Sequence, residues 1–587
     1  MSVIAGLQDF RQEAPPADIG VYHFPAAIIV FKYTFAGTTY VCAVRSGERG
    51  WVLVDFGTDA ATVINSAINA LTAGGKIFVM AGSYTISSVI LIQGKNGIIL
   101  EGEGWRSTKL VVSGADTICI KIGHRTDANL TSKDIIVRGF YIDGSSQTTE
   151  TTTPESVDRR FGIEVASPAQ QTEGVIIEEN YLYNTGSDSI YGYNAGDCTV
   201  RNNIVEATRG YWAAIHSHTV SGSNPYAYDP WKIIGNHLIG PMTTHNVIRH
   251  GKFIGYNSFY NCNNSEGVLM DSRGSIVVGN YFRSAATSFR GVVSWEGRSI
   301  IIGNTFWVES SLNEAIYISQ QNNVAIIGNI ISEWTGTSIP IHLDRANGCL
   351  VLANQIVNSA GWGIDLEGSS RNVVADNVLK NIGTGTNNTC DAIRLRAYGT
   401  TYSTRNIIED NQIFSDASNL PRYGINEADT NEDYNIIFGN VIANVATAAI
   451  NKQGVNTICK FNPGYPTETL LKTGLAPTIG TGDTYGPATT VTSLSGIIEL
   501  FKLAITIGGT FGTGETVTVK VETVWDDGST LSIEKSYTAV SSKTWLTDSE
   551  VQSLWKDGNA LRKINLYAKT NLSSTTVTVS IDVMAST

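Results

Sequence analysis

The central part of this chain repeats one short phrase at nearly constant spacing, and that repeat limits the possible folds more than any other feature. Between Glu266 and Asn377 the phrase reads GVLMDSRGSIVVGN, GVVSWEGRSIIIGN, AIYISQQNNVAIIGN, PIHLDRANGCLVLAN and GIDLEGSSRNVVADN. The closing asparagines are separated by 24, 25, 25 and 23 residues. A period in this range is typical of solenoids, in which each repeat buries its apolar face only against its neighbours.

Each repeat contains a segment in which apolar and polar residues alternate, such as 316–319 and 364–367. An alternation of period two predicts β-strands, so we expect a stack of β-coils. The closing asparagine continues in the same register in both directions, at Asn180, Asn203, Asn236, Asn257, Asn411 and Asn440. Either these asparagines are buried and hydrogen-bond to the coils above and below, or they occupy turns with a left-handed backbone.

With these repeats the chain resembles the right-handed parallel β-helix proteins of the pectate-lyase-like superfamily, over roughly Val54 to Cys459. That superfamily includes polysaccharide lyases, glycoside hydrolases and viral tailspikes. The resemblance implies an all-β fold built on a right-handed parallel β-helix, but it does not select one reaction. The likeness to tailspikes also implies a homo-oligomer, namely a trimer, although the chain lacks the heptads that would indicate one independently.

Segments on either side of the repeats predict additional elements. Residues 1–53 contain the candidate strands AAIIVFKYTF and TYVCAV, which we expect to form a β-hairpin that caps the solenoid; the alternative is a virion-attachment segment. Residues 54–462 are assigned to the β-helix. They begin with a capping helix at about 58–73, with Thr58 or Asp59 as its N-cap.

The repeat pattern ends near Lys460. Residues 463–489, rich in Gly, Pro and Thr, are interpreted as a linker. Residues 490–587 contain alternating strands, a turn at Asp527-Gly528 and a short helix in which Thr547 and Glu550 have capping-box spacing. We expect an antiparallel β-sandwich there, which would bind carbohydrate, mediate oligomers or cap the helix.

Composition excludes several classes of partner. The formal net charge of 41 − 53 = −12 argues against nucleic-acid binding, and an acidic substrate would need a local basic patch. The seven cysteines form no CxxC pair, so we expect no disulfide framework. No segment reaches membrane-spanning length, and no signal peptide is visible in MSVIAGLQDF. The expected location is therefore extracellular or virion-associated, with no membrane partner.

Aligning the coils converts sequence into geometry, because equivalent positions on parallel strands stack about 4.8 Å apart. The residues taken to point inward are Val268, Val292, Ile316, Ile341, Ile364 and Ile393. The outward positions that follow them carry a ribbon of ionisable and aromatic residues. From this ribbon we predict that substrate is bound by Asp271, Trp295, Tyr317, His342, Arg394 and Arg396.

The densest group in that ribbon is IHLD, IDLE and IRLR in three successive coils. Asp344 and Glu367 are expected one strand apart, near the ~5 Å separation of the carboxylates in retaining glycosidases. Crowding raises the pKa of one carboxyl, so the pair is predicted to act as acid and as nucleophile or base, with Asp365 in support. Alternatively, Arg394 and Arg396 neutralise Asp365 and Glu367 in a structural ladder.

A second candidate site lies at His216, His218 and Arg249, beside His250 and Tyr211. A lyase needs a base for the proton beside a uronic carboxylate and a cation to neutralise that carboxylate, and His or Tyr with Arg supplies both. Trp231 belongs to an aromatic-rich loop nearby and is also assigned to substrate binding. Without a third ligand the HSH motif is weak evidence for a metal, so we expect no metal and no cofactor, with calcium as the alternative.

Three functions remain open at this point. The leading hypothesis is a polysaccharide-degrading glycoside hydrolase that uses Asp344 and Glu367. The second is a polysaccharide lyase that acts by β-elimination on a uronic-acid polymer. The third is a non-catalytic glycan-binding or tailspike-like structural protein, in which the β-helix is only a stiff spine.

Overall fold

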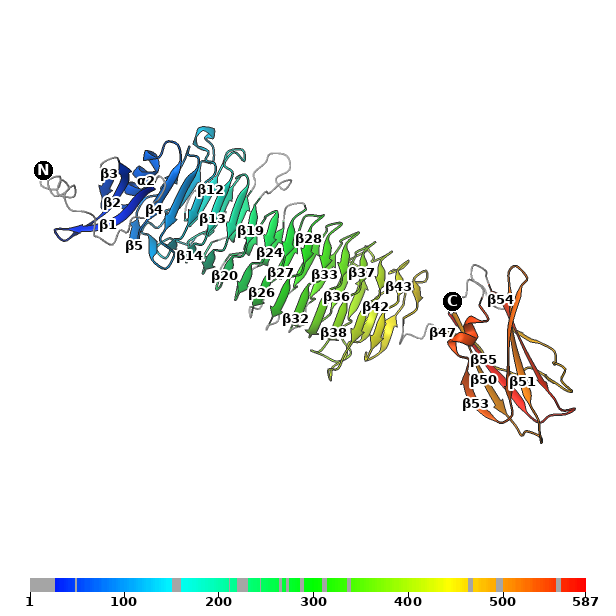
Figure 1. Cartoon of the computed structure of the whole chain (residues 1–587). Coiled ribbons are helices and arrows are strands. Elements are labelled where there is room, and N and C mark those ends of the chain that lie inside the picture. Colours follow the sequence, from blue (N-terminus) through cyan, green and yellow to red (C-terminus); the bar gives the residue numbers. More distant parts are fainter. Residues whose placement is uncertain are drawn as a thin grey trace. The chain divides into compact units, whose positions relative to one another are not determined.

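The computed structural model describes residues 27–47, 50–149, 160–210, 212–218, 231–242, 244–262, 266–270, 274–284, 290–308, 314–334, 339–462, 468–491, 500–555 and 561–586. The chain divides into two compact units, Met1–Ile458 and Cys459–Thr587, and each is described by itself. The first unit is a parallel β-helix, in which successive coils contribute strands to three long sheets (Figure 1).

Sheet A runs along one face of the β-helix and is joined by the strands of the N-terminal cap. Its coil strands are short, and their central side chains point inward. They are β4 (Gly75–Val79), β7 (Ile98–Gly102), β10 (Ile136–Arg138), β13 (Val175–Glu178), β16 (Cys198–Arg201), β19 (Lys232–Ile234), β22 (Phe253–Gly255), β25 (Ile276–Val278), β28 (Ile300–Ile302), β31 (Ala325–Ile327), β34 (Leu350–Leu352), β37 (Val373–Ala375), β40 (Ile407–Glu409), β43 (Ile436–Phe438) and β46 (Ile458–Lys460).

Sheet B follows sheet A in each coil after a sharp bend at the repeated asparagine. Its strands also alternate between buried and more exposed residues. They are β5 (Gly82–Ile86), β8 (Thr108–Val112), β11 (Tyr141–Asp143), β14 (Tyr181–Tyr183), β17 (Ile204–Glu206), β20 (His237–Ile239), β23 (Ser258–Tyr260), β26 (Tyr281–Ser284), β29 (Thr305–Val308), β32 (Ile330–Trp334), β35 (Gln355–Ser359), β38 (Val378–Ile382), β41 (Gln412–Phe414) and β44 (Val441–Ala443).

Sheet C carries the strands from which both candidate sites were predicted. They are β6 (Ile90–Ile92), β9 (Ile120–Gly123), β12 (Ile163–Ala166), β15 (Ile190–Tyr193), β18 (Ala213–His218), β21 (Asn246–Arg249), β24 (Glu266–Met270), β27 (Arg290–Ser294), β30 (Ile316–Ser319), β33 (Ile341–Asp344), β36 (Ile364–Glu367), β39 (Ile393–Arg396), β42 (Tyr423–Glu427) and β45 (Ala448–Asn451). The predicted inward row from Val268 to Ile393 pairs strand by strand as expected, which confirms the register.

The repeated asparagines form one continuous buried ladder from Asn180 to Asn440. At Asn304, for example, the side-chain amide donates to Asn329 Oδ1 at 3.0 Å, and Asn329 donates in turn to Asn354 Oδ1 at 2.9 Å. The same Asn329 amide also donates to the carbonyl of Ile301. The ladder interpretation is therefore confirmed.

The alternative of a left-handed backbone applies to the residue before each ladder position. Gly303, Gly328 and Ala353, for instance, have positive φ angles, whereas the asparagines that follow them do not. This bend turns the chain from sheet A into sheet B and leaves the asparagine side chain inside the coil. Glycine suits it because a Cβ is costly at positive φ.

The N-terminal cap is larger than the predicted hairpin. Strands β1 (Ala27–Phe35), β2 (Thr38–Gly47) and β3 (Gly50–Gly57) pair antiparallel in sequence order, and β1 also pairs with β4 in parallel. Asp59 caps helix α2 (Ala60–Ala70), where its side chain accepts from the Thr62 amide at 3.0 Å. The helix is shorter than the 58–73 expected, because Leu71 already has an extended backbone.

The second unit contains two antiparallel sheets around a separate apolar core that includes the fully buried Trp525. Its strands and helix are β47 (Glu468–Leu475), β48 (Ile479–Gly480), β49 (Thr489–Val491), β50 (Leu500–Gly508), β51 (Val517–Trp525), β52 (Thr530–Tyr537), β53 (Ser541–Trp545), α3 (Asp548–Gln552), β54 (Leu561–Thr570) and β55 (Thr578–Ser586). The capping box at Thr547 and Glu550 is present.

The predicted linker 463–489 needs correction, because half of its described part lies in paired strands. Strand β47 lies beside β55, and β48 lies beside β54. Gly, Pro and Thr are frequent here because the segment contains short edge strands and tight turns, which have the same composition as a linker.

Among the described residues, no helix is long and apolar enough to cross a membrane.

Candidate functional site

Sheet C differs from the other two sheets because the outward residues of several of its strands are buried as well as the inward ones. All four residues of β12 and of β33 are buried, whereas in sheets A and B the outward residues are mostly half-buried or exposed. The outward His, Asp, Glu and Arg side chains of sheet C therefore lie largely in a covered layer. Buried charges are stable only when they are paired and hydrogen-bonded, so their partners decide what this layer can do.

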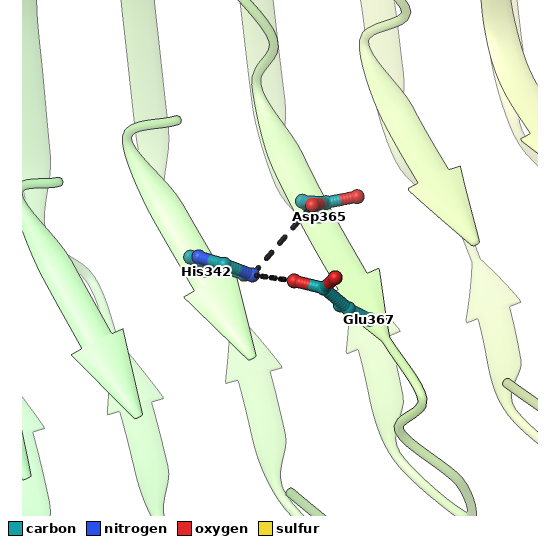
Figure 2. A group of neighbouring side chains, drawn as sticks. All are labelled: His342, Asp365 and Glu367. Carbon is teal, nitrogen blue, oxygen red and sulfur yellow. Dashed lines mark hydrogen bonds and ion pairs between the residues drawn. The ribbon is translucent and has the colours of Figure 1, made fainter. Parts of the chain in front are cut away.

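The predicted carboxylates belong to one connected group, here called the central network: Glu314, Tyr317, His342, Asp344, Arg345, Asp365, Glu367, Arg394 and Arg396. Figure 2 shows His342 on β33 directed toward Asp365 and Glu367 on the neighbouring strand β36. His342 Nε2 lies 3.0 Å from Glu367 Oε2 and 3.7 Å from Asp365 Oδ2. Its Nδ1 lies 3.5 Å from Glu314 Oε1.

Two arginines bind every oxygen of the Asp365 and Glu367 carboxylates in this network. Arg394 binds Asp365 through two hydrogen bonds, with Nε to Oδ1 at 2.8 Å and Nη2 to Oδ2 at 3.0 Å. Arg396 donates to Asp365 Oδ2 at 2.9 Å and also binds both oxygens of Glu367. These contacts match the structural ladder that was the alternative to catalysis for Asp365 and Glu367.

Asp344 lies one strand from Glu367, as the alignment predicted, but it faces different partners. Arg345 donates to both of its oxygens, at 2.7 and 2.9 Å, and the Tyr317 hydroxyl donates at 2.9 Å. Burial alone would raise the pKa of Asp344, yet Arg345 and Tyr317 lower it below its usual value. Asp344 is therefore held ionised, which opposes the role of general acid.

The ionisation of the other members follows the same logic. Burial raises the pKa of Asp365, but Arg394, His342 and Arg396 outweigh it and leave the pKa lowered. Burial lowers the pKa of His342, but the close contacts with the carboxylates of Glu314 and Glu367 outweigh it and raise the pKa to about 9. The network thus holds a protonated histidine among ionised carboxylates and arginines at neutral pH.

A metal ion fits this network poorly. One ligand atom from each of His342, Asp365 and Glu367 lies within 4.8 Å of the others, a spacing that a metal ion would require. However, Arg396 already binds both carboxylates, and a ligating histidine must be neutral. A cation here would have to displace Arg396 as well as the proton of His342.

The second candidate site centres on three histidines and is here called the histidine cluster: Asp188, Tyr191, Trp212, His216, His218, Arg249 and His250. His216 pairs with Tyr191 on one side and Arg249 on the other, in register on β15, β18 and β21. The ring of His216 lies 5.5 Å from His218 and 5.6 Å from His250, between centroids. The predicted pair His216 and Arg249 is therefore adjacent.

His216 has the contacts of a positioned base. Its Nδ1 lies 2.9 Å from Asp188 Oδ2, while Asp188 Oδ1 accepts from the Ala213 amide at 3.1 Å. Burial lowers the pKa of His216 well below its usual value, as do Arg249, His250 and His218. In the neutral ring Nδ1 donates to Asp188, and Nε2 is then an acceptor with no hydrogen-bond partner in the described chain.

Arg249 lies on the strand next to this base, and two further cationic side chains lie beyond Tyr191. The Arg249 guanidinium stacks 4.1 Å from the Trp212 ring, and Arg125 lies 5.5 Å from the Tyr191 ring. Arg125 and Lys121 both pair with Glu164, at 2.7 and 3.2 Å. The neighbourhood of His216 is thus locally basic in a chain of net charge −12.

His218 is half-buried beside the base, and the Tyr191 hydroxyl lies 3.2 Å from its Nδ1. Burial, together with His250, Arg249 and Arg125, lowers the pKa of His218 to about 4. It is therefore neutral at neutral pH, like His216.

The remaining residues predicted to bind substrate lie in different environments. Trp231 is fully buried inside the coil, where its ring would meet any Cβ placed at Gly192, so its assignment to substrate binding needs correction. Trp295 is 47% exposed on the sheet C side. Asp271 and Tyr211 lie outside the described residues.

Sequence reasoning missed Asp188, Tyr191, Glu314 and Arg345. Tyr191 shares a register position with His216, so extending the alignment by one coil would have found it. Asp188 and Glu314 lie before strands rather than in them, and Arg345 follows one. No periodic signal marks such positions.

Comparison with known proteins agrees with the fold. A family model described as the right-handed β-helix region matches residues 226–379. Similar solved structures include the A-module of mannuronan C-5 epimerase AlgE6 from Azotobacter vinelandii, at 17% identity and a TM-score of 0.37, covering 69% of this chain and 94% of that one. The surface protein and adhesin PfbA of Streptococcus pneumoniae matches at 13% and 0.39, covering 65% and 95%.

A phage protein is also among the similar solved structures. The pre-mature gene product 12 of bacteriophage phi29 matches at 13% identity and a TM-score of 0.43, covering 68% of this chain and 55% of that one. No curated protein sequence matches the chain. Likeness at these identities concerns the fold alone. The match to the β-helix family model and the three parallel sheets together identify the chain as a right-handed parallel β-helix protein, followed by an antiparallel β-sandwich.

Proposed function

We propose that this protein is a polysaccharide lyase that cleaves a uronic-acid polymer at the histidine cluster. The observation that supports this function above others is the neutral His216, held by Asp188 through Nδ1 while Nε2 has no hydrogen-bond partner in the described chain. A neutral imidazole can accept a proton at neutral pH, and Asp188 at Nδ1 would stabilise the imidazolium that forms and so offset the lowered pKa.

The reaction requires removal of a proton from C5 of the uronate. His216 Nε2 takes that proton, and the electron pair left on C5 forms the C4–C5 double bond as the C4–O bond breaks. Charge that develops on the adjacent carboxylate is stabilised by Arg249, since a fixed cation in a dry site acts strongly on developing charge. The Tyr191 hydroxyl donates a proton to the leaving oxygen and regains one by way of His218.

Access to the base needs a local opening. His216 is 2% exposed, so a sugar reaches Nε2 only when neighbouring side chains move. Trp212 and His218 are half-buried, and their ring centroids lie 6.3 and 5.5 Å from that of His216. Displacing the Trp212 ring would admit a substrate while His218 keeps its contact with the Tyr191 hydroxyl and β18 stays paired with β21.

The decisive experiment compares the parent with His216→Asn on a panel of neutral and acidic polysaccharides. Asparagine keeps a donor toward Asp188 but lacks Nε2, so the variant isolates the unpartnered nitrogen. We expect the parent to form new reducing ends together with ultraviolet absorbance from the unsaturated product. His216→Asn should lower kcat by roughly 10²–10⁴-fold, with a smaller change in KM.

The matched control is His237→Asn, which changes a histidine on sheet B that bonds Ser258. It should leave the rate unchanged. Unsaturated product formed at the parent rate by His216→Asn contradicts the assigned base, and cleavage without ultraviolet absorbance contradicts the lyase. An inactive parent on every polymer would favour a non-catalytic glycan-binding or structural protein.

Hydrolysis at the central network is the second candidate, favoured by the adjacency of Asp344 and Glu367 on neighbouring strands. It is weaker because the pKa of Asp344 is lowered by Arg345 and Tyr317 once burial is outweighed. Burial raises the pKa of Glu432 to about 7, but this residue is fully enclosed in the coil after β42. Loss of reducing-end release in Asp344→Asn alone, with His216→Asn fully active, would favour hydrolysis.

A further inference from the structure

The outer face of sheet A changes character halfway along the β-helix. In its first half the outward positions carry an ion-pair ladder, in which Arg138 bridges Glu101 at 2.6 Å and Glu178 at 3.4 Å. Arg201 extends this ladder by pairing with Glu178 at 2.6 Å. On the strands that follow β19, the outward positions no longer carry charged side chains, although the strands continue in the same register.

From β22 to β37, every outward position of sheet A is apolar or glycine. These residues, here called the apolar strip, are Phe253, Gly255, Ile276, Val278, Ile300, Ile302, Ala325, Ile327, Leu350, Leu352, Val373 and Ala375. Ile300 is 38% exposed and Leu350 is 39% exposed. Ile436 and Phe438 on β43 extend the strip with similar exposure.

The apolar strip is not needed for the interior of the β-helix. A separate inward row, which includes Val277, Ile301 and Ile326, is completely buried and fills the coil on its own. Both faces of a parallel sheet are usually covered, and a contiguous exposed apolar patch of this extent usually marks an interaction surface. On sheet B, in contrast, exposed residues such as Ile330 and Trp307 are interspersed with Ser332 and Gln355.

We propose that the apolar strip is the surface on which a second copy of this chain packs. Sheet A runs along the β-helix past β28 and β37 to β43 (Figure 1), and the strip occupies its outward positions one strand after another. Its branched side chains therefore recur at every strand spacing, about 4.8 Å. A partner that interdigitates along the whole strip needs the same repeat, and a second copy of the same β-helix has it.

The size of the strip suits this occupant. Eight strands from β22 to β43 at about 4.8 Å cover roughly 34 Å, and a width of about 20 Å with the flanks gives on the order of 700 Å². Each partner in a standard protein interface contributes about 800 Å². With its flanks, the strip thus approaches the area that each partner contributes to a standard interface.

The distribution of charge agrees with contact between copies. The chain carries a net charge of −12, so two copies repel each other as whole molecules. Six successive strands of the strip contribute no ionisable side chain, and Glu409 on β40 is the first one met beyond them. Two strips can therefore meet without burying an unpaired charge, which is the costliest defect in an interface.

The test is the mass of the full chain in solution, measured by light scattering over a range of concentrations. We expect a multiple of 63.2 kDa for the parent. Ile300→Glu combined with Leu350→Glu places two charges in the strip and should give 63.2 kDa at the same concentrations. Both side chains are already exposed, so the fold should tolerate the change, as circular dichroism will verify.

The matched control is Ile330→Glu combined with Val441→Glu on sheet B, where the exposed fractions are 44% and 51%. This variant should keep the mass of the parent. A parent of 63.2 kDa at every concentration would overturn the proposal. Persistence of the complex in Ile300→Glu with Leu350→Glu would overturn it as well.

Discussion

Two histidines on sheet C, His218 and His342, have pKa values shifted in opposite directions. Burial lowers the pKa of both His218 and His342, but the net result is about 4 for the first and about 9 for the second. The difference comes from their neighbours, since His218 faces His250 and arginines whereas His342 faces Glu314 and Glu367. Each charge state is therefore a property of the surrounding coils.

This contrast predicts the pH dependence of stability. The pKa of His342 is higher in the folded state than the usual 6.5, so its contribution is complete below pH 6.5 and is lost as pH rises through about 9. The shift corresponds to up to about 3 kcal/mol. His342→Gln should therefore flatten the loss of stability between pH 6.5 and about 9, measured by urea denaturation.

The control for that measurement is His237→Gln, because burial lowers the pKa of His237 and so its contribution changes only below pH 6.5. An alkaline limb that is equally steep in His342→Gln and in the parent would contradict the charge assigned to His342. On the acidic side, stability should instead fall as pH drops below 6.5, because the pKa values of His216 and His218 are lowered in the folded state.

At the scale of elements, the asparagine ladder joins successive coils at the bend between sheets A and B. Each side-chain oxygen accepts from both the backbone and the side-chain amide of the preceding asparagine, as Asn329 does from Asn304 at 3.0 Å in both cases. The positions are fully buried, so water cannot replace a missing partner. The ladder thus couples the stability of neighbouring coils.

Asn329→Ala should consequently cost about 2–5 kcal/mol of unfolding free energy, because two donors of Asn304 and the carbonyl of Ile301 lose a buried partner. Gln355→Ala is the matched control. It removes an exposed amide beside the ladder residue Asn354 and should change stability by less than about 0.5 kcal/mol. Equal denaturation midpoints for the two variants would show that the ladder contributes little.

At the scale of the whole molecule, the chain contains two units with separate cores. Trp525 packs edge-on against Trp555 in the second unit, with centroids 5.3 Å apart. Phe282 stacks between Phe259 and Phe306 in the β-helix, with centroids 4.3 and 4.6 Å away. Each aromatic group belongs to one unit only.

Calorimetry of the full chain should therefore resolve two unfolding transitions. Trp525→Ala should lower only one of them and Phe282→Ala only the other, since removing a buried aromatic side chain costs about 3–5 kcal/mol. Each variant serves as the control for the other. A single transition shifted by both substitutions would mean that the two units unfold together.

Much of the β-helix could be predicted from the sequence, because in a solenoid the spacing along the chain sets the contacts between strands. The 23- to 25-residue period was enough to place Asp344 beside Glu367 and to predict a ladder through Asn304 and Asn329. Asp59 could likewise be identified as a helix cap, since capping depends on residues only three positions apart.

Tertiary structure alone decided what the aligned side chains do. Asp188 and Glu314 lie between strands, where no periodicity marks them, yet Asp188 orients the ring of His216 and Glu314 helps to raise the pKa of His342. The burial of Trp231 and the covering of sheet C depend on how segments fold over a coil. Strand spacing is a local regularity that repeats, whereas the charge of a buried group depends on all its neighbours in space, and those come from several coils at once.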